Sequence, residues 1–120
     1  MRIGELADRT GVSVRALRYY EEAGLLHPGR CGNGYREFSE DDVARVWQIQ
    51  WLFSIGLCSG KISTVLPMVC GTGDAMNLDP ALADEVADTR ELIAARVAEL
   101  AASLDRLDHV IELARRPQAS

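Results

Sequence analysis

Residues 80–114 contain no glycine and no internal proline, and this run constrains the fold more than any other feature of the chain. Its leading apolar residues recur at the spacing of a heptad face, with Arg90 as the single interruption. They are Val86, Ile93, Val97, Leu100, Leu104, Leu107 and Ile111, and Ala114 continues the series. A helix of this length is about 50 Å long, so the short chain before it cannot cover the whole face. The pattern predicts a coiled coil with a second copy; the alternative is a helix that folds back onto its own domain.

Composition excludes several classes of protein. The 120 residues are 48% apolar and 26% charged, which is typical of one soluble domain with an extension. No stretch approaches the roughly 18 apolar residues of a membrane-spanning helix, and Glu5 stands where a secretion signal would be apolar. The three cysteines, Cys31, Cys58 and Cys70, are odd in number and unevenly spaced. We therefore expect a cytoplasmic protein without a disulfide framework and without contact with a membrane.

Charge is distributed unevenly along the chain. Residues 1–36 hold six arginines and four acids, a net charge of +2, whereas residues 37–120 hold seven basic and fourteen acidic residues, a net charge of −7. Together these give the formal net charge of −5. A basic N-terminal part followed by an acidic remainder favours a protein that binds a polyanion through its N-terminal part.

Residues 6–20 have the spacing of a helix-turn-helix. Gly11 stands where the turn requires a left-handed backbone, and Ser13 is a good N-cap for the second helix. Leu17 and Tyr20 are expected to point inward, beside the apolar Val12. Two small helices with no role in DNA binding are the alternative interpretation of this segment.

The outward face of the second helix carries the candidate contacts to DNA. The N-terminal part of a recognition helix enters the major groove, and the forked guanidinium of Arg15 matches guanine O6 and N7. Arg18 and the Tyr19 hydroxyl are better placed for phosphates, which position a protein without specifying sequence. The set of candidate residues on this helix comprises Ser13, Val14, Arg15, Arg18 and Tyr19.

A small β-hairpin, or wing, is predicted directly after this helix. Residues 25–26 and 35–38 flank a loop that ends in Asn33 and Gly34, a strong tight-turn pair. Arg30 and Arg36 flank the predicted tip and Tyr35 lies near it, which suits contact with the DNA backbone or minor groove. A hairpin with a purely structural role is the alternative.

Two short helices are predicted in residues 39–74. Ser39 is a good N-cap and is followed by three acids, which suit the positive end of a helix. This helix should end near Gly56, and a second helix should run from Ser59 to Leu66. Gly71 and the residues after it read as a flexible joint.

Four motifs together resemble the mercury-resistance-regulator (MerR) family of bacterial transcription regulators: IGELA at residues 3–7, VRALRYYE at 14–21, GLL at 24–26 and GYR at 34–36. The resemblance implies a homodimer joined by an antiparallel coiled coil. It also implies binding to a pseudo-palindromic promoter whose spacer is bent and untwisted so that RNA polymerase can engage. By family position, the DNA-contacting residues would be Arg15, Arg18, Tyr19, Tyr35 and Arg36.

The expected fold is mainly α. A winged helix-turn-helix occupies residues 1–38, linking helices that complete the DNA-binding domain occupy 39–74, and the antiparallel coiled-coil dimerisation helix with a short tail occupies 75–120. Only six residues follow Ala114, so the large drug-binding domain of some relatives is not expected.

The sequence does not name an effector. No cysteine follows Cys70, the cysteines of an iron–sulfur centre are missing, and His27 and His109 are far apart, so neither a metal site nor a cofactor is expected. Cys58 and Cys70 flank the second linking helix and are candidate thiol sensors. The alternative is that both are small buried apolar side chains.

Two other functions are alternatives to promoter regulation. No nucleophile–base pair, carboxylate dyad or phosphate-binding loop is recognisable, so an enzyme is not expected. A recombination accessory or architectural DNA-binding protein is the closer alternative, because such proteins also use winged helices. The long dimerisation helix favours the regulator.

Overall fold

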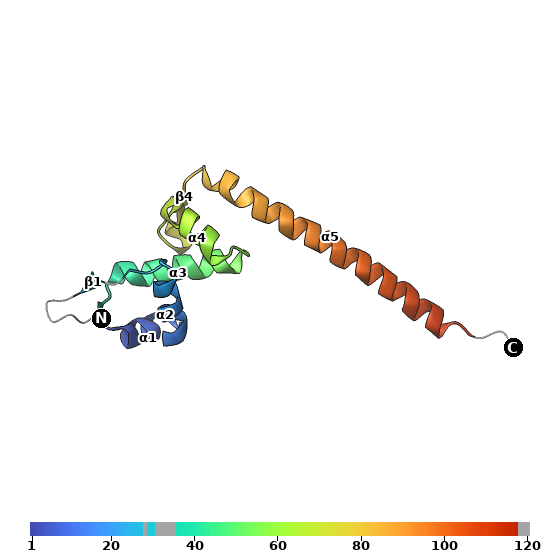
Figure 1. The fold of residues 1–120 in the computed structure, drawn as a ribbon, viewed down its shortest axis with the longest axis horizontal. Helices are drawn as coiled ribbons and strands as arrows, with labels where there is room; N and C mark the ends of the chain where they lie inside the picture. The colour runs from blue at the N-terminus through green and yellow to red at the C-terminus, as the bar shows by residue number, and fades with distance from the viewer. Residues whose placement is uncertain (28, 31–35, 118–120) are drawn as a thin grey trace. The chain divides into compact units, whose positions relative to one another are not determined.

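The computed structural model describes residues 1–27, 29–30 and 36–117. Contacts divide the chain into two units, Met1–Glu85 and Val86–Ser120. The first unit contains, in order, α1 (Ile3–Thr10), α2 (Val14–Glu22), β1 (Gly29–Arg30), β2 (Arg36–Glu37), α3 (Glu40–Ser54), α4 (Ser59–Val65), η1 (Leu66–Met68), β3 (Val69–Cys70), η2 (Gly73–Ala75) and β4 (Asn77–Leu78). The long helix α5 (Leu82–Arg115) follows, as Figure 1 shows. The expected fold, a helical protein with a winged helix-turn-helix and a long C-terminal helix, is confirmed.

The α1–α2 pair forms the predicted helix-turn-helix. The turn contains Gly11 in the left-handed region, with φ of 74°, and the Gly11 N–H donates to the Ala7 carbonyl at 2.9 Å. Ser13 caps α2, because its Oγ accepts a hydrogen bond from the Ala16 N–H at 3.1 Å. Leu6 and Leu17 are completely buried between the two helices and α3. The predicted cap, turn and inward face are therefore confirmed.

Helix α3 supplies the centre of the core in this unit. Ser39 precedes it, and the Asp42 carboxylate accepts a hydrogen bond from the Ser39 N–H at 2.8 Å, which closes a capping box. The helix ends at Ser54, before the left-handed Gly56, where the sequence indicated a break. Its buried apolar residues are Val43, Val46, Ile49 and Leu52.

The segment after α4, which the sequence predicted to be a flexible joint, forms a small hairpin in the structure. Strand β3 pairs antiparallel with β4, and the 3-10 helix η2 lies between them. Gln48, a buried polar residue of α3, donates its Nε2–H to the Gly71 carbonyl at 3.0 Å. The hairpin is thus held by a contact with a residue distant in the sequence. No local sequence pattern predicts such a contact.

Replacing Gly71 with alanine should destabilise this unit by about 1–3 kcal/mol. Gly71 has a φ of +74°, and a Cβ on it would clash with the Ala75 carbonyl group. Urea unfolding followed by tryptophan fluorescence measures the change. Gly60→Ala is the matched control: a Cβ there meets no atom within 4 Å, and alanine should stabilise α4 by about 0.5–1 kcal/mol. Equal stability of the Gly71 variant and the parent would contradict the assignment.

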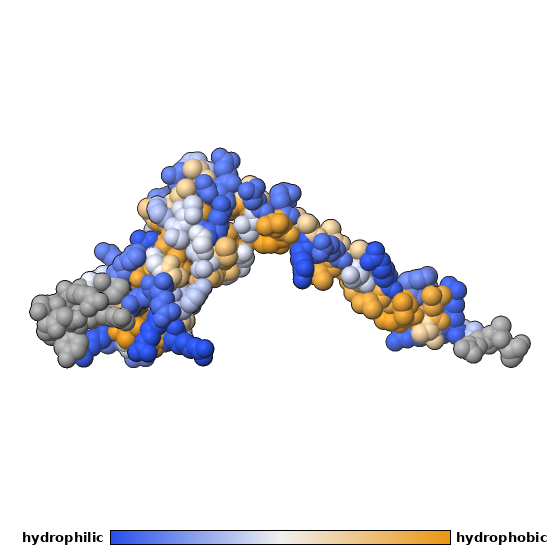
Figure 2. Space-filling model, in the orientation of Figure 1, coloured by the Kyte–Doolittle hydropathy of each residue, from blue (hydrophilic) through white to orange (hydrophobic). Residues whose placement is uncertain are grey.

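Helix α5 begins two residues later than the sequence predicted. The Asp79 carboxylate accepts a hydrogen bond from the Ala81 N–H at 2.9 Å, so Pro80 and Ala81 form a turn before Leu82. From Ile93 onward the heptad residues are 44–60% exposed in the single chain. Figure 2 shows hydrophobic side chains along this helix. No helix in the described part of the chain is long and apolar enough to cross a membrane.

Candidate nucleic-acid interface

The outward face of α2 carries a shallow, open depression. It is lined by Val14, Arg15, Arg18, Tyr19 and Glu22. Both arginines are exposed, and in the described residues neither forms an ion pair. The helix therefore presents two unpaired cations to the solvent. The sequence correctly predicted which residues of α2 are exposed and which are buried. It did not indicate that Glu22, one helical turn after Arg18, also lines this depression.

Tyr19 and Tyr20 have different surroundings although they are neighbours. The Tyr20 ring is buried and stacks on Phe53 of α3, with centroids 5.8 Å apart and an interplanar angle of 20°. Burial raises the pKa of the Tyr20 hydroxyl. Tyr19 remains 48% exposed. One tyrosine thus anchors α2 against α3, and the other has an accessible hydroxyl.

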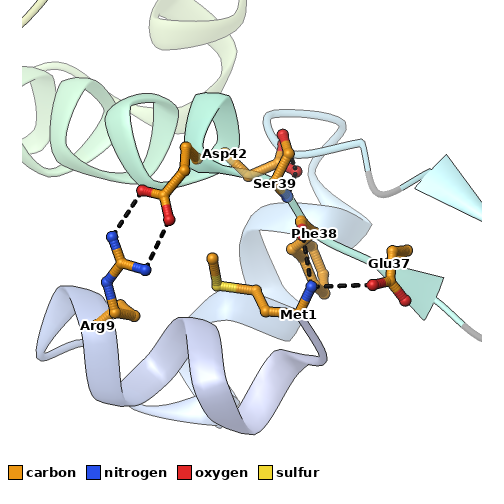
Figure 3. Close-up of polar contacts among 7 residues, drawn as sticks. Met1, Arg9, Glu37, Phe38, Ser39 and Asp42 are labelled. Atoms are coloured by element: carbon orange, nitrogen blue, oxygen red, sulfur yellow. Dashed lines mark hydrogen bonds and ion pairs between the residues drawn. The ribbon is translucent and has the colours of Figure 1, made fainter.

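The base of the wing is joined to the start of the chain. Strands β1 and β2 pair antiparallel, with Gly29 opposite Glu37 and Arg30 opposite Arg36. The Met1 ammonium group donates to Glu37 Oε1 at 3.0 Å and to the Phe38 carbonyl at 2.7 Å (Figure 3). In return, the Phe38 N–H donates to the Met1 carbonyl at 2.7 Å. These contacts hold the wing beside α1.

Arg9 holds α1 against α3 and is not available for phosphates. Its two terminal nitrogens donate to the two carboxylate oxygens of Glu40 at 2.7 and 2.6 Å. The hydrogen bond from Arg9 lowers the pKa of the Glu40 carboxyl group. Because both side chains are at least half exposed, this pair contributes more to orientation than to stability.

The wing is smaller than the sequence predicted. Leu25 and Leu26 were expected to flank the hairpin, but both are buried in the core before β1, where their N–H groups donate to the Tyr20 carbonyl. The backbones of Arg30 and Arg36 lie opposite each other in the two strands. The remaining candidate of the wing, Tyr35, lies outside the described residues.

Cys58 and Cys70 are both exposed, so the interpretation of these residues as buried apolar side chains is wrong. Cys58 immediately precedes α4, and Cys70 lies in β3 next to Gly71. Their accessibility meets one requirement of a thiol sensor, and that role stays a prediction. Within the described ranges, no group of three or more metal-ligating side chains could hold a metal ion.

Comparison with known proteins identifies the family. Residues 1–69, more than half of the chain, match the family of MerR helix-turn-helix regulatory proteins. The chain belongs to the MerR family. It is therefore a regulator of the DNA-binding helix-turn-helix type, as its motifs predicted.

Relatives of this MerR-family chain include the mercuric resistance operon regulatory protein of Bacillus cereus, which is 41% identical over 69 residues, 57% of this chain and 52% of the relative. This chain spans about half or less of the curated relatives that it matches first. The lead(II)-bound regulator PbrR691 of Ralstonia metallidurans CH34 superimposes with a TM-score of 0.71 and 25% identity, over 100% of this chain and 89% of the other. HiNmlR, a MerR-family regulator bound to promoter DNA, has the same fold, with a TM-score of 0.53 and 22% identity over 92% and 86% of the two chains.

Proposed function

We propose that this MerR-family chain binds a pseudo-palindromic promoter as a homodimer and distorts the spacer to control RNA polymerase. The observation that carries the proposal is the face of α2, a capped helix whose outward side presents Arg15 and Arg18, neither of which forms an ion pair with another described residue. The wing follows directly in the sequence. HiNmlR, which is bound to promoter DNA, supports the suitability of this fold for such a partner.

Each candidate residue has a role in this proposal. Arg15, in the first turn of α2, reads a guanine edge in the major groove, with Ser13 and Val14 beside it at the helix start. Arg18 and Tyr19 contact phosphates. The wing residues Arg30, Tyr35 and Arg36 contact the backbone or minor groove.

The long helix provides the second half of the proposal. Residues 1–38 contact DNA, residues 39–74 complete the DNA-binding domain, and residues 75–120 join two copies. The heptad residues of α5 are about half exposed in the single chain. They support pairing, because one chain alone leaves this apolar stripe open to water. Two linked recognition helices then occupy two symmetry-related half-sites, and polymerase responds to the bent spacer between them.

Arg15→Ala should weaken specific binding by about 1–3 kcal/mol for each half-site and relax the preference at one base position. Arg36→Ala should weaken binding evenly across sequences and reduce its salt dependence, because a phosphate contact is lost. Fluorescence anisotropy with promoter and scrambled duplexes at several salt concentrations separates these effects. Arg106→Ala, on the exposed surface of α5, is the control and should bind like the parent.

The contact assignment is wrong if both variants bind the cognate promoter as tightly as the parent. Footprinting on the same fragments tests the wider role. Protection of one symmetric site within a promoter supports regulation, whereas tandem sites at a recombination locus support an architectural protein instead.

A further inference from the structure

The first turn of α5 is attached to the rest of the first unit. The Asp79 N–H, just before the helix, donates to the Met68 carbonyl of η1 at 2.9 Å. Leu82, the first residue of α5, is buried. The Lys61 ammonium group of α4 donates to Glu85 Oε2 at 3.0 Å. Glu85 is also the last residue of the first unit, so this ion pair holds α5 at the point where the helix leaves that unit.

The Lys61–Glu85 pair differs from an ordinary surface ion pair. Its side chains are 28% and 37% exposed, whereas those of the equally long Arg90–Glu91 pair within α5 are 77% and 73% exposed. Water and salt screen a partly enclosed pair less than an exposed one. Lys61 and Glu85 are 24 positions apart, and Arg90 and Glu91 are neighbours. The first pair therefore restrains one helix relative to another, and the second does not.

Glu85 supplies a counter-charge that α4 itself does not have. The helix, Ser59–Val65, contains no acidic residue, so Lys61 has no partner within it. Removing one member of the pair leaves the other partly enclosed without a counter-charge. Such a group moves toward water, and its helix moves with it.

A series of packed helices connects this ion pair to the candidate DNA-binding face. Helix α4 packs against α3. Tyr20 of α2 stacks on Phe53 of α3, with ring centroids 5.8 Å apart. Arg15 and Arg18 lie on the outward face of the same α2 helix. The first turn of α5 is thus held in a fixed position relative to the residues that face DNA.

We propose that Lys61 and Glu85 are positioning residues for DNA binding, because their ion pair fixes the direction of α5 and so the separation of two recognition helices in the dimer. This inference rests on the proposed function, in which residues 75–120 join two copies. It adds a role for two residues that contact neither DNA nor the second copy in that proposal.

The length of α5 makes its direction important. It is one continuous helix from Leu82 to Arg115, so a tilt of its first turn moves all later residues. The heptad residues of α5 form an apolar seam, and residue 102 lies midway along it, about 30 Å from Leu82. A tilt of about 10° displaces the helix there by about 5 Å. This displacement exceeds the roughly 3.4 Å rise of one base pair, so the two recognition helices no longer match both half-sites.

The proposal predicts different effects on one half-site and on two. A single half-site is contacted by one first unit, through the face of α2. A complete site requires two units at a set separation, and the second contact gains from a high effective concentration only while that separation is kept. Loss of the ion pair should therefore weaken binding to the complete site alone.

Lys61→Met and Glu85→Gln remove the two charges with little change in side-chain size. Fluorescence anisotropy in the full chain compares a duplex that carries the complete footprinted site with one in which a half-site is scrambled. Each variant should bind the complete site about tenfold more weakly than the parent and the single half-site equally well. Lys61→Glu combined with Glu85→Lys reverses the pair and should recover most of the loss. Glu91→Gln, which breaks the exposed pair in the same helix, is the matched control and should bind like the parent.

A measurement without DNA checks the ion pair itself. Lys61 is the only lysine of the chain, so protein labelled with ¹⁵N at lysine Nζ gives one side-chain ammonium signal in NMR spectra. That signal should shift in Glu85→Gln and stay unchanged in Glu91→Gln. An unchanged signal in Glu85→Gln overturns the pair and the proposal with it.

The binding results separate this proposal from the proposed function. Parent-like affinity of both single variants for the complete site overturns the positioning role alone. Equal losses on the complete site and on one half-site also overturn it, because the pair then maintains the fold of the first unit instead. A parent that binds no duplex overturns both proposals. If a single variant does not fold, Glu85→Asp tests the same point: it keeps the charge, shortens the side chain and should weaken only binding to the complete site.

Discussion

Leu104→Asp should convert the proposed dimer into a monomer at micromolar concentration. Leu104 is 60% exposed in the single chain, so most of its burial must come from a partner. Burying one leucine contributes about 1.5–3 kcal/mol, and a symmetric dimer loses two, which raises the dissociation constant about 10²–10⁴-fold. An aspartate in the seam adds the cost of desolvating a charge. Sedimentation velocity across a concentration series measures the change.

Loss of the dimer should also reduce promoter binding, because a monomer engages one half-site and loses the gain from linked sites. Ala102→Asp is the matched control: it introduces the same charge two residues away on the outward face and should leave the dimer intact. The fluorescence of Trp47 and Trp51 in the first unit should be unchanged in both variants. A Leu104→Asp protein that sediments as a stable dimer contradicts the role of the seam.

Leu17→Ala should lower the free energy of unfolding of the first unit by about 2–5 kcal/mol. Leu17 is completely buried on the inner face of α2. Alanine leaves a cavity there that the close-packed helices fill only in part. Urea unfolding followed by the fluorescence of Trp47 and Trp51, both in α3, measures the loss.

The companion variant for this prediction is Arg15→Ala, two residues earlier in the same helix. It removes an exposed side chain and should leave the unfolding transition within about 0.5 kcal/mol of the parent while weakening DNA binding. The two variants thus separate the packing face of α2 from its contact face. If Leu17→Ala unfolds at the parent's urea concentration, the packing assignment fails.

Much of the helical fold could be predicted from the sequence because helices leave local signals. Gly11 and Ser13 mark the helix-turn-helix by backbone conformation and capping, and Ser39 marks the start of α3. The spacing of apolar residues predicted α5 to within two residues at its start. That difference arose from the Asp79 side chain, whose hydrogen bond to Ala81 stabilises a turn before the helix.

The remaining features depend on contacts between distant residues. Strands β3 and β4 have two residues each, too few to show alternation, and the Gln48–Gly71 hydrogen bond joins residues 23 positions apart. The Arg9–Glu40 pair spans 31 positions. In both cases the sequence contains the participants, but only the packing of α3 brings them together.

The candidate interface, like the fold, could be predicted from the sequence only in part. Helical geometry alone separates Leu17 and Tyr20 from Arg15 and Arg18. It does not show that Arg9 forms an ion pair whereas Arg15 and Arg18 form none with the residues that the structure describes. That distinction required the structure.

The half-exposed leucines of α5 also bear on the fate of a newly made chain. Before the proposed pairing takes place, each chain exposes this apolar stripe, and exposed apolar surface favours aggregation and recognition by chaperones or proteases. Pairing removes that liability. Pairing depends on concentration, so at a low rate of synthesis more chains stay unpaired and are degraded. The abundance of the regulator in the cell should therefore depend steeply on its rate of synthesis.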